Sequence, residues 1–85
     1  MAKDILRAFW NCGDNEIIEF AIRRARLNSD EKKVCECLLD ECMTQEETAE
    51  HLHNSVRWVQ KKWDSAKRKL LSIPWVTVYG ISLTK

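Results

Sequence analysis

Two helix starts lie close together in residues 44–63, "TQEETAEHLHNSVRWVQKKW". Thr44 is followed three residues later by Glu47, the spacing of a capping box, in which the hydroxyl and the carboxylate each accept a backbone amide. The letters "HNS" predict a tight break, after which Ser55 is a suitable cap for a second helix. An apolar stripe recurs along that second helix at i, i+4, i+7 and i+11: Val59, Trp63, Ala66 and Leu70. The segment therefore predicts two helices around a short turn, a helix-turn-helix.

The spacing within this segment is more specific than the general pattern. Helix-turn-helix units tend to carry Gln first, a small residue four later, Gly eight later and an aliphatic residue fourteen later; here these are Gln45, Ala49, His53 and Val59. The small alanine lets the two helices cross closely. His53 departs from the glycine, although His tolerates the left-handed conformation expected at the turn better than most residues. Asn54 also departs, because an aliphatic residue is common there.

Residues 27–70 resemble region 4, the carboxy-terminal promoter-reading domain of bacterial sigma factors, a pattern that small phage and mobile-element regulators share. The resemblance covers about half the chain and rests on these matches: Glu31, Val34, Thr44, Glu46, Glu47, Ala49, Glu50, Leu52, Ser55, Val59, Ala66, Lys69 and Leu70. The departures are Thr48, His53, Asn54 and Lys62. Trp63 is placed to take over the core role of the aliphatic residue expected at 62. The resemblance implies a transcription regulator of bacterial or phage origin.

Charge is divided unevenly along the chain. Residues 1–54 hold seven Lys/Arg and twelve Asp/Glu, a net charge of −5, whereas residues 55–85 hold seven Lys/Arg and one Asp, a net charge of +6. Charged helix faces are usually just solvated surface, but such faces usually mix signs. We therefore expect sequence-specific binding of double-stranded DNA, with the basic helix in the groove. The alternative is a non-catalytic protein-interaction module that docks on RNA polymerase or another regulator without reading DNA.

The predicted DNA-binding residues follow from the geometry of the second helix. Its outward positions at the start are Val56, Arg57, Gln60 and Lys61, which suit contacts with base edges. The resemblance likewise implies that Arg57, Gln60 and Lys61 face promoter DNA. Thr44 and Gln45 at the preceding helix start are expected to contact phosphates, and Ser55 is also expected among the DNA-binding residues. Lys67, Arg68 and Lys69 lie further along the helix and suit either contacts with the DNA backbone or a partner surface. Trp58 is ambiguous between packing and a surface contact.

The remainder of the chain also favours helices, because only two glycines and one proline interrupt it. One helix is expected over residues 3–10. A second is capped by Asp14 or Asn15 and has an apolar face made of Ile17, Ile18, Ala21, Ile22 and Ala25. A third is capped by Asn28 or Ser29, with Val34, Cys37, Leu38 and the weaker candidate Glu41 at helical spacing. We expect an all-α bundle of four to five helices.

The expected helices predict how the chain is organised into a domain. We expect one domain over residues 1–85, with amino-terminal helices in 1–27, the helix-turn-helix core in 28–71 and an extension in 72–85. In that extension Pro74 stops the long helix, and residues 75–79 alternate in the manner of a short β-strand. Such a strand needs a partner. It either folds back over the amino-terminal helices, covering Phe9 and Trp10, or pairs with its copy in a homodimer, or meets a different protein.

Several other function classes are not expected. The cysteines at 35 and 37 have the spacing C-x-C, which on a helix points two sulfurs to different faces, so we expect reduced structural thiols and no zinc. No catalytic motif or phosphate loop occurs, which predicts a non-catalytic protein without a cofactor. No apolar run approaches the ~20 residues of a membrane span, and the amino terminus lacks the apolar stretch of a signal peptide. These features predict a cytoplasmic protein.

Overall fold

A computed structural model describes residues 2–84. Within that range it contains six α-helices, one π-helical turn and no β-strand: α1 (Ala2–Trp10), α2 (Asn15–Ala25), α3 (Ser29–Cys35), η1 (Glu36–Asp40), α4 (Gln45–His51), α5 (Val56–Leu71) and α6 (Pro74–Thr84). The all-α prediction is confirmed. The helix count exceeds the four to five expected, because residues 74–84 form a further helix and not a strand.

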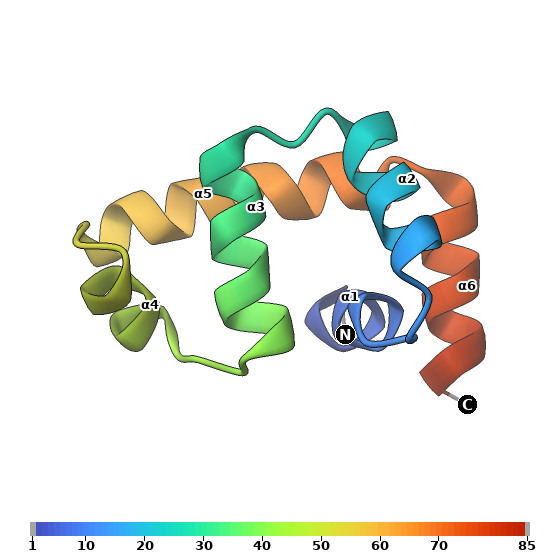
Figure 1. The fold of residues 1–85 in the computed structure, drawn as a ribbon, viewed down its shortest axis with the longest axis horizontal. Helices are drawn as coiled ribbons and strands as arrows, with labels where there is room; N and C mark the ends of the chain where they lie inside the picture. The colour runs from blue at the N-terminus through green and yellow to red at the C-terminus, as the bar shows by residue number, and fades with distance from the viewer. Residues whose placement is uncertain (1, 85) are drawn as a thin grey trace.

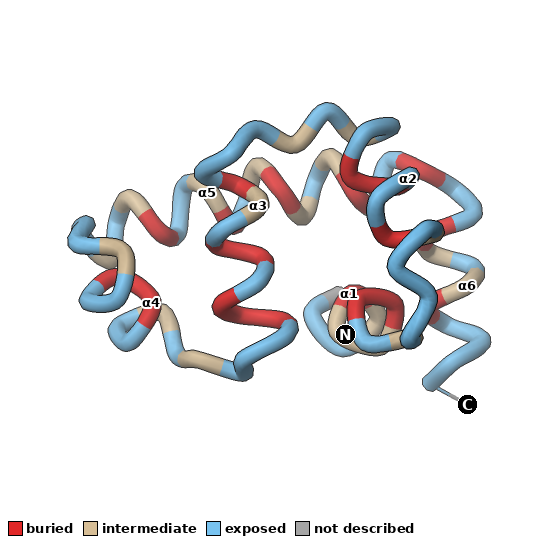
Figure 2. The backbone as a smooth tube through the Cα atoms, in the orientation of Figure 1, coloured by how far each residue is buried: buried red, intermediate tan, exposed pale blue. Residues whose placement is uncertain are grey.

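Helix α5 organises the molecule. It runs along the longest axis, with α4 at one end and α6 at the other, while α3 crosses it near the middle (Figure 1). The predicted stripe is fully internal, since its four members Val59, Trp63, Ala66 and Leu70 are all buried. Figure 2 shows buried residues recurring along α5. Trp63 occupies the core as predicted, and the neighbouring Lys62 is half-buried.

Side-chain caps fix where the helices begin. The Asp14 carboxylate accepts from the backbone N–H groups of Glu16 and Ile17 at 3.1 and 3.2 Å. Asn28 forms a capping box with Glu31, in which each side chain accepts the other residue's backbone N–H. These bonds satisfy helix amides that have no partner within the helix. Of the paired alternatives at the two starts, Asp14 and Asn28 are therefore the caps.

The turn between α3 and α4 differs from the expected regular helix. The α-helix changes at Glu36 into the π-helical turn η1, in which backbone hydrogen bonds join residues five positions apart and not four. The inward face broadens as a result: Val34, Cys35, Cys37, Leu38 and Leu39 are all buried. The suggestion that Glu41 continues the face is wrong, because Glu41 is exposed. The π-turn shifts the register before that residue is reached.

The carboxy-terminal segment is a helix that folds back on α1. Proline is well suited to the first turn of a helix, and Pro74 begins α6 after only two connecting residues, Ser72 and Ile73. Val76 and Gly80 are buried. A Cβ atom at Gly80 would lie 2.5 Å from Ile5 Cγ2 and 2.7 Å from the Ile5 carbonyl oxygen, so only glycine permits this approach. Packing against α1 thus overrides the strand preference of the β-branched residues.

Aromatic rings complete the contact between the two ends of the chain. Phe9 of α1 is fully buried, and its ring makes edge-on contacts with Trp75 and Tyr79 of α6, each at a centroid distance of 6.0 Å. Of the alternatives for the tail, folding back over the amino-terminal helices is therefore the one observed, and Phe9 is covered as that alternative required.

Candidate nucleic-acid interface

A left-handed residue closes α4 and starts the turn to α5. His53 has φ 57°, as expected for the turn position where glycine is usual. Its N–H donates to the Glu50 carbonyl at 3.2 Å, and the Asn54 N–H donates to the Ala49 carbonyl at 2.9 Å. These two bonds make a Schellman motif, which ends the helix and turns the chain within three residues. The backbone then enters α5 at Ser55.

The two helices meet through small and aliphatic residues. Ala49 of α4 and Val59 of α5 are both buried, and Leu52 is half-buried against the same core. Ser55 is the helix cap, since its hydroxyl oxygen accepts the Trp58 N–H at 3.1 Å. The hydroxyl of Ser55 is therefore occupied as an acceptor, although the residue itself is exposed.

The outward side of the first turns of α5 carries polar side chains. Arg57, Gln60 and Lys61 are all exposed, whereas Val56 is half-buried and packs against the core. Positions 57, 60 and 61 lie on one side of an α-helix because they differ by three and four residues. The structure therefore brings three of the predicted base-contacting residues together, and turns Val56 partly inward.

A hydrogen bond connects α4 to this polar side. Gln60 Nε2 donates to Gln45 Oε1 at 3.2 Å, across fifteen positions of sequence. In this arrangement Gln60 keeps its carbonyl oxygen as an acceptor and Gln45 keeps its amide N–H groups as donors. The two glutamines thus present one acceptor and one donor side by side, at the junction of the helices.

Thr44 has less freedom to contact a ligand than its position suggested. Its hydroxyl accepts the Glu47 N–H at 3.1 Å, and its own backbone N–H donates to the Glu47 carboxylate at 3.0 Å. The capping box predicted from the sequence is therefore formed. The exposed side of α4 also carries Glu46, Glu47 and Glu50, whose negative charges oppose the approach of a phosphate.

The basic residues near the end of α5 separate into different roles. Arg68 is exposed. Lys67 is half-buried, with its ammonium 3.5 Å from the Asp64 carboxylate and 5.6 Å from the centre of the Trp63 ring. Lys69 turns inward, where its Nζ lies 2.7 Å from Glu31 Oε1. Lys69 therefore belongs to the scaffold, and Arg68 is the residue of this cluster best placed for a phosphate.

Trp58 packs and does not project freely. It is half-buried against the core, and the Lys62 ammonium lies 5.8 Å from the centre of its ring. A cation over an aromatic face is attracted by the ring electrons. Of the two roles left open for Trp58, packing against the core is therefore the one that the structure shows, and Lys62 is held near the surface of α5.

Glu31, which the sequence pattern marks only as a match to region 4, carries a buried carboxylate. Its side chain accepts from the Asn28 backbone N–H at 3.0 Å, from Lys69 and from the Ser65 hydroxyl. Burial alone raises the pKa of Glu31, but the bonds from Asn28, Lys69 and Ser65 outweigh it, so the pKa lies below its ordinary value. Glu31 stays ionised and holds α3 against α5, which supports the interface from behind.

The four cysteines are free thiols. Burial raises the pKa of Cys35 to about 12, with Glu31 and Glu36 adding to the effect. Cys37 is also buried, and its pKa is raised by burial and by Glu41 and Glu36. Within residues 2–84, no three His, Cys, Asp or Glu side chains gather in a group that could hold a metal ion. None of the helices in that range is long and apolar enough to cross a membrane.

No protein-family model, curated protein or solved structure matches this chain. The candidate interface therefore rests on the positions, charges and hydrogen bonds of its own residues.

Proposed function

We propose that the chain binds double-stranded DNA in a sequence-specific manner and regulates transcription. In this proposal α4, the turn at His53 and α5 act as a helix-turn-helix, and the start of α5 enters the major groove. One observation carries the proposal. The apolar stripe of α5 is buried while Arg57, Gln60 and Lys61 stand exposed together on its outward side, beside the Gln45–Gln60 hydrogen bond.

The chemistry of these side chains suits base recognition. Arg57 and Lys61 can donate to the N7 and O6 atoms of guanine, and Gln60 can accept from an amino group of adenine or cytosine. Gln45, at the start of α4, can donate to a backbone phosphate. The first half of α5 contains three basic residues and no acidic one, which favours association with polyanionic DNA.

The sequence resemblance gives the proposal its biological setting. The pattern shared with sigma factor region 4 expects small or aliphatic residues at Ala49, Val59, Ala66 and Leu70, and these four are buried. The resemblance further implies that Arg57, Gln60 and Lys61 face promoter DNA. We infer a small, non-catalytic regulator of a bacterium or phage, acting in the cytoplasm.

A second candidate function is docking on RNA polymerase or another regulator without reading DNA. The acidic surface of α4 favours it, since Glu46, Glu47 and Glu50 are exposed on the helix that precedes the turn and would repel DNA phosphates. The two candidates differ in salt dependence. DNA binding weakens steeply as salt concentration rises, because it releases the counterions condensed on DNA, whereas docking through an apolar surface changes little. Docking through the acidic side of α4 is separated by removing charge instead, because Glu46→Gln with Glu50→Gln should weaken such docking and should not weaken DNA binding.

The proposal is tested by selecting bound sequences from random duplexes, followed by affinity measurements on the enriched site. Arg57→Ala and Lys61→Ala should each weaken that site by roughly 1–3 kcal/mol and relax the choice of one base pair. A matched control replaces Lys3 of α1 and Arg24 of α2, two exposed cations outside the helix-turn-helix, with alanine. Failure to enrich any sequence, or a folded Arg57→Ala/Lys61→Ala variant that binds as tightly as the parent, would contradict the proposal and favour the docking function.

A further inference from the structure

The outer side of α6 is apolar although it faces solvent. Helix α6 contains no charged residue in a chain of which 32% is charged. Its outward positions are all exposed: Pro74, Trp75, Val78, Ile81 and Ser82. Val78 is the most open of its large apolar side chains, at 67% exposure. A helix without charged side chains is normally covered by other elements, whereas α6 packs mainly on α1 and leaves these positions open to solvent.

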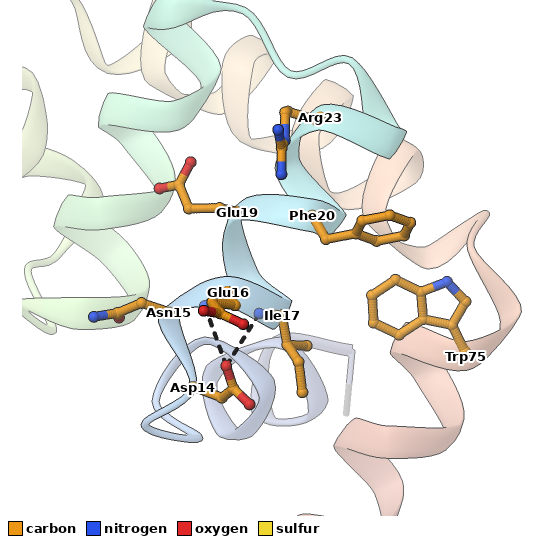
Figure 3. Close-up of a pocket in the computed structure, with 8 residues that line it drawn as sticks. All are labelled: Asp14, Asn15, Glu16, Ile17, Glu19, Phe20, Arg23 and Trp75. Atoms are coloured by element: carbon orange, nitrogen blue, oxygen red, sulfur yellow. Dashed lines mark hydrogen bonds between the residues drawn. The ribbon is translucent and has the colours of Figure 1, made fainter.

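The exposed surface continues from α6 onto α2. Phe20 is 53% exposed, and its ring centre lies 5.8 Å from that of Trp75. Figure 3 shows the two rings facing each other across the groove between the helices. We call Phe20 and the outward residues of α6 the α6 patch. It lies at the opposite end of the long axis from α4 and the turn, so it stays open when the start of α5 is engaged (Figure 1).

We propose that the α6 patch is the interface of a two-fold homodimer. The first argument is area. The exposed parts of its apolar side chains amount to roughly 400 Å², within the size range of patches that are commonly functional. Homodimer interfaces are about 65% apolar, so such a patch corresponds to roughly 1,200 Å² buried in total by two chains. That total reaches the lower bound of stable, specific interfaces.

The second argument is charge. A face without ions can lie against its own copy without burying one, whereas a strongly charged partner would gain nothing from it. The rim carries both signs, with Glu16 and Arg23 exposed on α2 beside the groove. In a two-fold interface each surface meets its own equivalent in the opposite direction, so acidic and basic rim residues of the two chains can face each other.

The experiment measures the mass of the full chain in solution by sedimentation equilibrium, from low to high micromolar concentration and without DNA. We expect a reversible dimer. Val78→Glu should raise its dissociation constant by more than about tenfold, because the interface would then bury a carboxylate. Val78→Lys should do the same, since either sign is unfavourable there. The matched control Ser29→Glu adds the same charge at an exposed position of α3 outside the patch and should leave the dimer intact.

Helicity measured by circular dichroism checks that each variant is folded, and the 67% exposure of Val78 makes unfolding unexpected. A parent chain that stays monomeric throughout, that forms open-ended oligomers, or whose dimer survives both charges at position 78 overturns the proposal. Because no DNA is present, these outcomes are independent of the proposed function.

Discussion

The Lys69 ammonium lies 2.7 Å from a carboxylate oxygen of Glu31, a residue that is only 1% exposed. The bond joins the last part of α5 to the first turn of α3. Glu31 also caps α3 through Asn28 and accepts from Ser65, so a single carboxylate serves a helix start and an interhelical contact. The scaffold behind the candidate interface therefore contains an ionised carboxylate, and protonating it should lower the free energy of unfolding.

Stability should fall in acid through Glu31. Its pKa in the folded chain lies below the ordinary value of 4.5, so the folded state favours the charged form. This contribution is complete above about pH 4.5 and is lost as the pH falls through the lower, folded-state pKa. Urea unfolding at a series of pH values should show a smaller loss in acid for Glu31→Gln than for the parent. The exposed control Glu50→Gln should keep the slope of the parent, and equal slopes for all three would refute the assignment.

Gly80→Ala should destabilise the fold although alanine is the better helix former. The added methyl would meet the Ile5 carbonyl oxygen at 2.7 Å, which is backbone and cannot turn aside. We expect the strain to exceed the gain of about 1 kcal/mol in helix propensity and to leave a net loss of about 1–2 kcal/mol. Chemical denaturation measures this difference. A more stable Gly80→Ala variant would show that α1 and α6 are less closely packed than described.

His53→Gly should stabilise the chain. His53 has φ 57°, where a side chain is strained and glycine is not. We expect a gain of about 0.5–1 kcal/mol in the free energy of unfolding, measured by thermal or chemical denaturation. His51→Gly is the matched control two residues earlier, inside right-handed α4, and should cost up to about 1 kcal/mol. Equal effects at the two histidines would contradict the left-handed turn.

The cysteines should differ in reactivity toward alkylating reagents. Cys42 is exposed, whereas Cys35 is fully buried and its pKa is raised to about 12. At pH 8 the thiolate of Cys35 is therefore scarce as well as shielded, and thiolate is the reacting form. Mass spectrometry of peptides after brief iodoacetamide treatment should find Cys42 modified and Cys35 intact, while denatured protein reacts at both. Early modification of Cys35 in the folded chain would disprove this packing.

If α5 contacts DNA, its two neighbouring basic residues should contribute unequally. Arg68 is exposed, while Lys67 is already paired with Asp64 at 3.5 Å. Arg68→Ala should lower the slope of log affinity against log salt by about one unit and weaken all sequences alike. Lys67→Ala should change the slope less. Affinity titrations at several salt concentrations compare the two variants, and a larger effect at Lys67 would reverse the assignment.

Local signals predicted most of the helices. Capping acts over three residues, so Thr44 and Ser55 could be named as caps without knowing the fold, and the caps of α2 and α3 could be narrowed to Asp14 or Asn15 and to Asn28 or Ser29. The carboxy-terminal helix could not be predicted in this way. Its β-branched residues favour a strand, and only the distant packing of Gly80 on Ile5 decides for a helix. The π-turn after Cys35 likewise has no local signal.

The candidate site was predictable in outline. Helical spacing placed Arg57, Gln60 and Lys61 outward, and all three are exposed. Helical spacing could not predict which of the following basic side chains are free and which are paired, because the ion pair of Lys69 is with Glu31, thirty-eight residues away. It also could not predict that Gln45 and Gln60 would be hydrogen-bonded across the junction of two helices.

The unbroken course of α5 has a mechanical consequence. Its 16 residues form one rod about 24 Å long. The exposed polar residues lie near one end, and α6 packs near the other, with no interruption of the helix between them. In a dimer joined through the α6 patch, two such rigid helices would be held in a fixed orientation to each other. The distance between the two reading ends would be set by the protein, so the spacing of two half-sites on DNA would matter as much as their sequence.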